Sequence, residues 1–234
     1  MKDNNVNNKK NKILFVVLII IAIILIHFVR NAIIIKSLAN KVEELKSSEL
    51  NNYHIKWVSY SFDTTTVFDI YYKDGMYRKD TYKLDYTHPT LPYTKVSEYK
   101  LKDGSKVGIF ELDQKVQTYD KNDEQTQDDS LISIANFSHI EMYLVTPSSF
   151  INNCLLNIIT KDKNNGEDVY KVTSIFDDKI EYFSCDTGLT VRSDSWYSTN
   201  TNFYNTRTDI LIEFDCVTDE DIIVPDLEGY TNID

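Results

Sequence analysis

The stretch ILFVVLIIIAIILIHFV, residues Ile13–Val29, decides where the rest of the chain lies. Seventeen residues of α-helix extend about 25 Å, near the lower limit for crossing the hydrocarbon core of a bilayer. Ala32–Ile35 lengthen the run if Arg30 and Asn31 are tolerated. The preceding tail carries four lysines and one acidic residue, so the positive-inside rule predicts a cytoplasmic N-terminus. We therefore expect a basic cytoplasmic tail over 1–12, a transmembrane signal anchor over 13–35 and an extracytoplasmic C-terminal domain at the cell membrane.

A cleaved signal peptide is the alternative to an anchor. Ser37-Leu38-Ala39 resembles a small-x-small cleavage site. However, Arg30, Asn31 and Lys36 separate that site from the apolar run, which is also longer than the usual apolar region of about 7–15 residues. We therefore favour the anchor.

The charge of the chain argues against binding to nucleic acid. Residues 1–36 hold six basic residues and one acidic residue, so the formal charge of −11 for the whole chain becomes −16 for residues 37–234. So acidic a domain repels nucleic acid and anionic headgroups. The membrane itself and another membrane protein are therefore the expected partners, and nucleic acid is not.

The cysteines do not indicate a metal site. Cys154, Cys185 and Cys216 all follow the apolar run, without a CxxC pair or a histidine cluster. Their odd number leaves at least one without an intramolecular partner. We interpret them as small buried residues on strands, with one disulfide as the alternative.

The periodicity of the chain after the apolar run changes from helix to strand. Residues 36–51, KSLANKVEELKSSELN, place Leu38, Val42 and Leu45 on one helical face, which predicts a stalk helix or a first domain helix. A second amphipathic helix is expected over 131–144. About ten strands joined in hairpins account for the rest, and are expected near residues 53–57, 67–73, 76–84, 96–102, 106–112, 114–120, 154–161, 168–176, 179–185, 189–196 and 206–216. Residues 52–234 are thus expected to form a mainly β (α+β) domain, a curved antiparallel half-barrel with one or two helices on its concave face.

Three phrases carry a resemblance to a known family. They are YYKDGMYR (Tyr71–Arg78), CDTGLTVR (Cys185–Arg192) and FDCVTDEDIIVPDLEGY (Phe214–Tyr230). With the order hairpins, helix, hairpins, they resemble the LolA/LolB/LppX-like lipoprotein-carrier superfamily, which includes the N-terminal domain of RseB-type regulators, and more closely its membrane-attached Gram-positive relatives. The resemblance implies an open half-barrel that holds acyl chains or a lipid tail without covalent chemistry. A transmembrane tether departs from the soluble or lipid-anchored carriers and favours local lipid sensing or regulation over shuttling.

An apolar inner surface is the predicted binding site. Parity within each strand places a set of apolar side chains on one face, where they would line a cavity, with the 131–144 helix as a lid. The leading hypothesis is that the cavity binds a lipid acyl chain or lipidated partner; the alternative is a packed cavity in an envelope-sensing or regulatory interaction module. The predicted lining residues are Trp57, Phe68, Ile70, Phe110, Leu112, Val172, Ile210, Ile212 and Phe214.

Enzyme and metal signatures are weak. The histidines after the apolar run, His54, His88 and His139, are not accompanied by a Gly-x-Ser-x-Gly, Ser-x-x-Lys or HExxH motif. We therefore predict a non-enzymatic protein without cofactor or metal. The region around Asp120 begins like a calcium loop, but Gln125 takes the place of the required glycine and Leu131 that of the bidentate glutamate.

Overall fold

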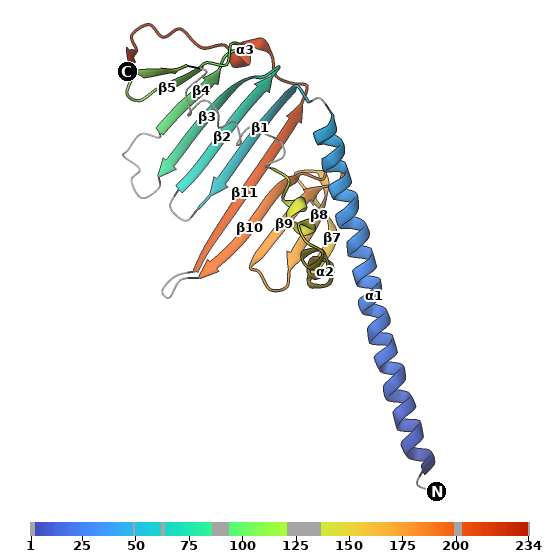
Figure 1. The fold of residues 1–234 in the computed structure, drawn as a ribbon. Coiled ribbons are helices and arrows are strands. Elements are labelled where there is room, and N and C mark those ends of the chain that lie inside the picture. The colour runs from blue at the N-terminus through green and yellow to red at the C-terminus, as the bar shows by residue number, and fades with distance from the viewer. Residues whose placement is uncertain are drawn as a thin grey trace.

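The structure is a computed structural model that describes residues 3–48, 50–61, 64–85, 94–120, 137–198 and 203–233. These residues form a long N-terminal helix, one large sheet and three short helices (Figure 1). In chain order the elements are α1 (Asp3–Ser47), β1 (Asn52–Tyr60), β2 (Thr64–Lys73), β3 (Met76–Asp85), β4 (Thr94–Lys100), β5 (Lys106–Phe110), β6 (Lys115–Tyr119), the 3-10 helix η4 (His139–Leu144), α2 (Pro147–Leu156), β7 (Asn157–Asn164), β8 (Glu167–Ser174), β9 (Lys179–Ser184), β10 (Thr190–Ser198), β11 (Phe203–Phe214), α3 (Asp219–Ile222) and β12 (Thr231–Asn232).

The twelve described strands form one open sheet in the order β12-β6-β5-β4-β3-β2-β1-β11-β10-β9-β8-β7. All neighbours are antiparallel except β12, which runs parallel to β6. The predicted strands are all present, and the predicted mainly antiparallel sheet is confirmed. The additional strand β12 has two residues, too few to give a periodic pattern.

The hairpin turns form where the sequence predicts them. Asp74 and Gly75, between β2 and β3, both have positive φ, as a two-residue turn that matches the twist of the strands requires. Pairing of β1 with β11 joins the first group of hairpins to the second, with Ile55 opposite Ile212 and Trp57 opposite Ile210.

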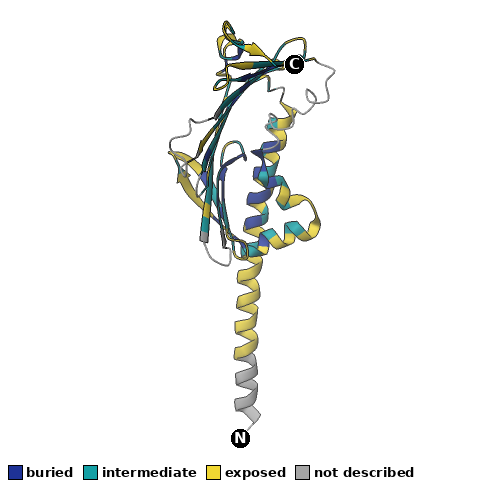
Figure 2. Cartoon of the chain, turned by 90° about the vertical axis from the view of Figure 1, so that its left-hand side faces the viewer, coloured by how far each residue is buried: buried dark blue, intermediate teal, exposed yellow. Residues whose placement is uncertain are grey.

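The sheet is curved, and α1 and α2 lie against one of its faces (Figure 2), called the inner face below. Helix α1 is continuous for 45 residues, about 68 Å at the standard rise. Its large apolar side chains from Ile13 to Ile26 are 43–68% exposed. Lys12–Ser47 is the one helix in the described part of the chain that is long and apolar enough to cross a membrane.

The predicted helix at 36–51 is the last part of α1. Leu38 and Val42 are buried in the main core, so this segment is a domain helix and not a free stalk. The hydrophobic stripe that the sequence shows at Leu38, Val42 and Leu45 exists because these side chains face the sheet.

Helix α2 was not predicted, and its last residues, Cys154–Leu156, were assigned to a strand. The helix starts at Pro147, after Thr146 whose hydroxyl oxygen accepts from the Ser149 amide at 3.0 Å. Thr-Pro-Ser-Ser is thus a helix N-terminus with a capping residue and a proline in the first turn. Of the predicted helix 131–144, residues 131–136 lie outside the described residues, and the described end is the 3-10 helix η4.

The C-terminal phrase covers the outer face of the sheet. Val224, Leu227 and Tyr230 pack on a second apolar cluster formed by Tyr99, Val107 and Ile109 of β4 and β5. A capping box at α3 fixes the start of this segment, because Thr218 and Asp221 exchange hydrogen bonds. The tail therefore belongs to the domain and ends by pairing β12 with β6.

Candidate functional site

The inner face of β11, β1 and β2 is an apolar surface built by register. Ile55 on β1 lies between Ile212 of β11 and Ile70 of β2, and Trp57 lies between Ile210 and Phe68. Since side chains alternate between faces along a strand, all of these point the same way. Ile55 and Ile70 are 0% and 2% exposed, so something covers them.

Helix α1 forms part of that cover, together with Phe137, whose ring meets Trp57 edge-on at 6.3 Å, and Ile140. Ile35, Leu38 and Val42 are at most 1% exposed and belong to the same cluster as Ile55 and Ile70. They recur at helical spacing, so one stripe of α1 faces the sheet. The surface that the sequence predicts as a ligand site is, in this part of the sheet, occupied by the protein's own helix.

Polar side chains fix the position of α1 along the sheet. Arg30 Nη2 donates to the carbonyl of Ile159 at 2.8 Å. Asn31, fully buried, donates through Nδ2 to the carbonyls of Cys154 at 3.0 Å and Asn157 at 2.8 Å. One turn past Leu38, Lys41 Nζ donates to the carbonyl of Cys185. Because these hydrogen bonds go to carbonyls on separate elements, they can all form in only one position of α1 along the sheet.

Gly188 lies directly against the backbone of α1. It has φ +74°, and a Cβ placed on it would lie 2.3 Å from the carbonyl oxygen of Leu38. A side chain at this position therefore strains the backbone and collides with α1. Cys185–Arg192, one of the phrases that carries the resemblance, contains the turn between β9 and β10 and the first residues of β10. Helix α1 contacts this turn, in which Leu189 is 1% exposed in the main core.

The nine predicted lining residues do not share one environment. Phe68 is stacked on Trp57 with ring centroids 5.0 Å apart, Phe110 lies opposite Val96 and is half-buried, and Leu112 lies beyond the end of β5 and is 51% exposed. The other six belong to the core cluster that α1 covers or pack against it, namely Trp57, Ile70, Val172, Ile210, Ile212 and Phe214. Their role as a ligand cavity stays a prediction.

A small polar hollow of about 130 Å³ lies between α2, η4 and strands β7 to β9. It is smaller than the roughly 300–1,000 Å³ of typical ligand pockets. Its buried carboxylate, Glu181, accepts from Tyr143 at 2.6 Å and contacts His139 Nδ1 and Lys179 Nζ, both at 2.8 Å. Burial alone would raise the pKa of Glu181, but these three contacts outweigh it and lower the pKa to about 2. The network ties η4 to β9.

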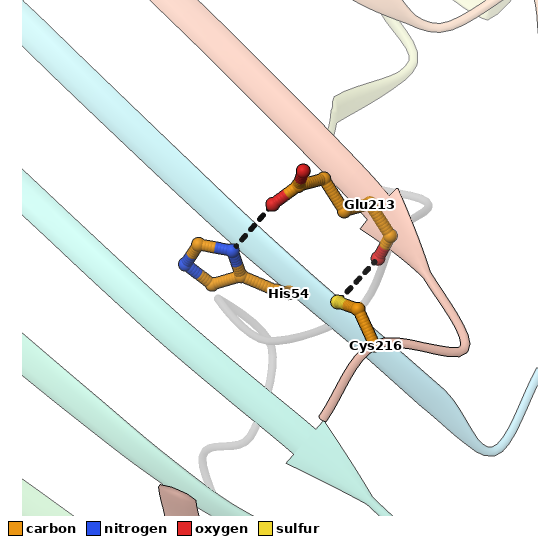
Figure 3. A group of neighbouring side chains, drawn as sticks. All are labelled: His54, Glu213 and Cys216. Carbon is orange, nitrogen blue, oxygen red and sulfur yellow. Dashed lines mark hydrogen bonds and ion pairs between the residues drawn. The ribbon is translucent and has the colours of Figure 1, made fainter. Parts of the chain in front are cut away.

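A second polar group lies on the outer face, where His54, Glu213 and Cys216 approach one another (Figure 3). His54 Nε2 lies 2.5 Å from Asp69 and its Nδ1 lies 3.1 Å from Glu213. Both ring nitrogens thus already have a carboxylate partner. Burial and the charge of Glu213 raise the pKa of the exposed Cys216 thiol, so the thiolate that nucleophilic attack or metal binding requires is disfavoured. We interpret the group as an ion-pair cluster.

The remaining predicted candidates are the other histidines, the calcium-like loop and the cysteines. His139 contacts Glu181 in the hollow described above, whereas His88 and the calcium-like loop after Asp120 lie outside the described residues. The interpretation of the cysteines as buried residues on strands is wrong: Cys154 is buried but on helix α2, Cys185 is half-buried in a turn and Cys216 is exposed after β11. All three are free thiols.

Sequence reasoning missed the docking of α1. The signal was the interruption of the apolar run by Arg30 and Asn31, which favoured an anchor over a signal peptide but was not connected with the domain. A buried asparagine needs hydrogen-bond partners, and partners for a helix residue at the end of a membrane span lie in the adjoining domain.

No protein-family model matches the chain, and no curated protein sequence matches it. Among solved structures, one chain of the Pseudomonas aeruginosa MucA/MucB complex is similar, with 15% identity and a TM-score of 0.39, over 82% of this chain and 61% of the matched one. LprF from Mycobacterium bovis has 10% identity and a TM-score of 0.41, over 82% and 96%. A LolA superfamily protein from Nitrosomonas europaea has 7% identity and a TM-score of 0.21, over 81% and 97%.

This chain spans about three fifths of the matched chain of the MucA/MucB complex. One of these structures is a member of the LolA superfamily, which the sequence phrases also resemble. At these identities the likeness says nothing about what this chain binds.

Proposed function

We propose that the protein is a non-enzymatic, single-pass membrane protein whose extracytoplasmic domain is a regulatory or envelope-sensing interaction module with a packed inner face. The observation that carries the proposal is the docking of α1, whose residues Ile35, Leu38 and Val42 fill the inner face at 0–1% exposure. A carrier with an open cavity would leave that surface free. The partner would then be a membrane protein or lipidated protein bound at the outer face or rim.

The same docking supports an anchor that is retained. Cleavage after Ala39 would remove Asn31, Ile34, Ile35 and Leu38, all of them buried in the domain. Burial of the three apolar side chains contributes on the order of 5–9 kcal/mol, which is comparable to the whole stability of a typical domain. We propose residues 1–12 as the cytoplasmic tail and 13–29 as the span, with the domain beginning at Arg30.

Acyl-chain binding, the leading hypothesis from the sequence, is the second candidate. It is favoured by apolar side chains of the inner face that lie outside the main core cluster, beginning with Phe68, whose ring stacks on Trp57. The inner-face row continues from Phe68 through Thr81 and Val96 to Phe110, beyond the residues that α1 covers.

Photocrosslinking separates the two functions. The full chain is reconstituted in phosphatidylcholine vesicles that contain a lipid with a diazirine near the end of its acyl chain, and crosslinked peptides are mapped by mass spectrometry. The packed module predicts crosslinks within residues 13–29 and none on the strands that carry Trp57 and Phe68. Crosslinks on those two strands would contradict it and establish an acyl chain on the inner face.

A substitution on β11 gives a second comparison. Phe214 packs against the main core, whereas Leu211 on the same strand is 52% exposed. If the inner face is packed, Phe214→Asp places an unpaired charge against the core and lowers the unfolding midpoint strongly, while Leu211→Asp changes it little. A Phe214→Asp variant with an unchanged midpoint and lost lipid crosslinks would instead support a ligand cavity.

A further inference from the structure

Helix α2 lies at the height where α1 would leave the membrane. The ring of Phe150 on α2 meets the ring of Phe28 with centroids 6.4 Å apart, and Phe28 lies one residue before the end of the apolar run. At the C-terminal end of α2, the carbonyl of Cys154 accepts from Asn31 at 3.0 Å. Residues 150 and 154, one turn apart on α2, thus contact α1 at 28 and 31, and Lys36 Nζ lies 5.5 Å from the centroid of the Phe150 ring. A helix held across another at this height lies along the bilayer surface if α1 crosses it (Figure 2).

This end of the domain exposes large apolar side chains. Ile151 and Leu155, one turn apart on α2, are 47% and 36% exposed, and Ile158 at the start of β7 is 49% exposed. Ile175 and Phe176, in the turn between β8 and β9, are 56% and 74% exposed. The Ile175 amide donates to the carbonyl of Leu156 at 3.1 Å, so the turn and the end of α2 are adjacent. These five residues are called the membrane-proximal patch.

Hydrogen bonds hold the turn that carries Phe176 in one conformation. The Ser174 hydroxyl contacts Asp177 Oδ2 at 3.1 Å and also accepts from the Asp177 amide at 3.0 Å. These bonds close the turn and leave Phe176 at its tip. An aromatic side chain presented at a fixed tip, beside an amphipathic helix, is the arrangement by which proteins enter the boundary between headgroups and acyl chains.

The surroundings of the patch favour lipid over another protein as its occupant. On α1 at the same height, an open apolar hollow of about 500 Å³ is lined by Leu25, Ile26, Val29, Arg30, Ile33 and Ile34. Hydrocarbon surrounds the part of this surface that lies below Arg30 in any membrane that α1 spans, and the remainder lies directly above it. The patch is therefore next to lipid by geometry. Because Asp177 and Asp178 follow Phe176, the expected surface is zwitterionic and not anionic.

We propose that the membrane-proximal patch docks into the headgroup–acyl boundary of the outer surface of the bilayer, with α2 lying in the membrane plane. This inference rests on the membrane anchoring proposed above. Docking adds a second attachment to the one that α1 provides, so it fixes the rotation of the domain about α1. The sheet then stands on the membrane with its β7–β9 end down and its C-terminal tail far from the lipid, as the arrangement in Figure 1 requires.

Depth-dependent fluorescence quenching tests the proposal on the full chain. The background carries Cys185→Ser and Cys216→Ser, and keeps the buried Cys154. Single cysteines replace Phe176 or Ile151 in the patch, Val16 in the span and Glu228 in the exposed tail, each labelled with the dye NBD. The labelled chains are reconstituted in phosphatidylcholine vesicles with or without lipid that bears a doxyl quencher at carbon 5 of the acyl chain.

Docking predicts that the labels at positions 176 and 151 are quenched several-fold more than the label at 228 and that their emission is blue-shifted. The label at 16, which reports on the span, is also expected to be quenched. If the label at 16 is quenched while 176 and 151 behave like 228, the anchor stands and docking is overturned. If the label at 16 is not quenched, both anchoring and docking are overturned. A blue shift at 176 without doxyl quenching, which grows with protein density, would assign the patch to a second copy of the chain and overturn the lipid assignment.

Discussion

The two halves of α1 are both rich in isoleucine, leucine and valine, yet they lie in different surroundings. From Ile13 to Ile26 the large apolar side chains are exposed on every side of the helix, at 43–68%. From Ile35 to Val42 one stripe is fully buried, while Ile33 is 64% exposed. A helix that is apolar all round is typical of a membrane span or of the core of a large protein, whereas a single apolar stripe is typical of a helix that packs on one protein surface. The change falls at Arg30 and Asn31, where polar side chains bind the domain.

The largest effect is expected from two truncations that separate the two halves of α1. A chain that starts at His27 keeps the buried half of α1, and we expect it to unfold cooperatively. A chain that starts at Asn40 lacks Ile34, Ile35 and Leu38, and should lose on the order of 5–9 kcal/mol of unfolding free energy, enough to abolish a cooperative transition. Urea unfolding followed by circular dichroism measures both. Equal midpoints would show that the docked half of α1 is dispensable.

The next largest effect is expected at Gly188, on which the docked half of α1 rests. Gly188→Ala adds backbone strain at φ +74° and a Cβ against the Leu38 carbonyl, and should cost roughly 2–5 kcal/mol. Gly75→Ala is the matched control, because Gly75 also has positive φ but nothing lies within 4 Å of its Cβ position. It should cost only the strain, about 1–2 kcal/mol.

Thermal unfolding of the two alanine variants gives the comparison directly. A lower midpoint for Gly188→Ala than for Gly75→Ala is expected, because only the first separates α1 from the sheet. Equal shifts for both would mean that α1 is not seated against the 185–192 turn.

The Glu181 network, which lies in the domain, predicts that the unfolding free energy depends on pH. The pKa of Glu181 is lowered to about 2 in the folded protein. Its contribution to stability is therefore complete above the ordinary carboxyl pKa near 4.5 and is lost as the pH falls from there toward 2. The loss is on the order of 3 kcal/mol. Urea midpoints measured between pH 6 and pH 3 should fall steeply in the native chain.

Glu181→Gln is the control for this pH dependence. It removes the titrating group, so stability at pH 7 should be lower and the fall below pH 4.5 shallower than in the native chain. An equally steep fall in the variant would assign the acid sensitivity to other carboxylates.

Much of the sheet could be predicted, because its strands carry local signals. Alternation such as Tyr53, Ile55 and Trp57 marks the strands, and Asp74-Gly75 marks a turn. The apolar parity also selected residues that lie in the core, such as Ile70 and Ile210. What fills the space above a face is not a local property. The covering residues, from Ile34 to Val42, are separated from the β11 residues that they cover by more than 160 positions.

Helix α2 shows a different limit. Its sequence, PSSFINNCLL, mixes serine and asparagine with β-branched and aromatic residues, so intrinsic propensity does not favour a helix. Contacts of Phe150 with Phe28 and of the Cys154 carbonyl with Asn31 stabilise it from outside. Tertiary packing thus stabilises a helix that intrinsic propensity does not predict. For the same reason, the sequence does not predict the apolar patch that α2 carries.

The smallest expected effect tests the point where the two halves of α1 meet. Asn31→Ala leaves the carbonyls of Cys154 and Asn157 without their buried donor, and should cost about 1–3 kcal/mol. Ile33→Ala, two residues away and 64% exposed, removes more apolar surface but touches no such partner, and should change the unfolding free energy by less than about 0.5 kcal/mol in detergent. If Ile33→Ala were the more damaging of the two, the exposed side of this turn and not Asn31 would hold α1 to the domain. Chemical unfolding of both variants in the same detergent therefore shows which side of the turn packs on protein.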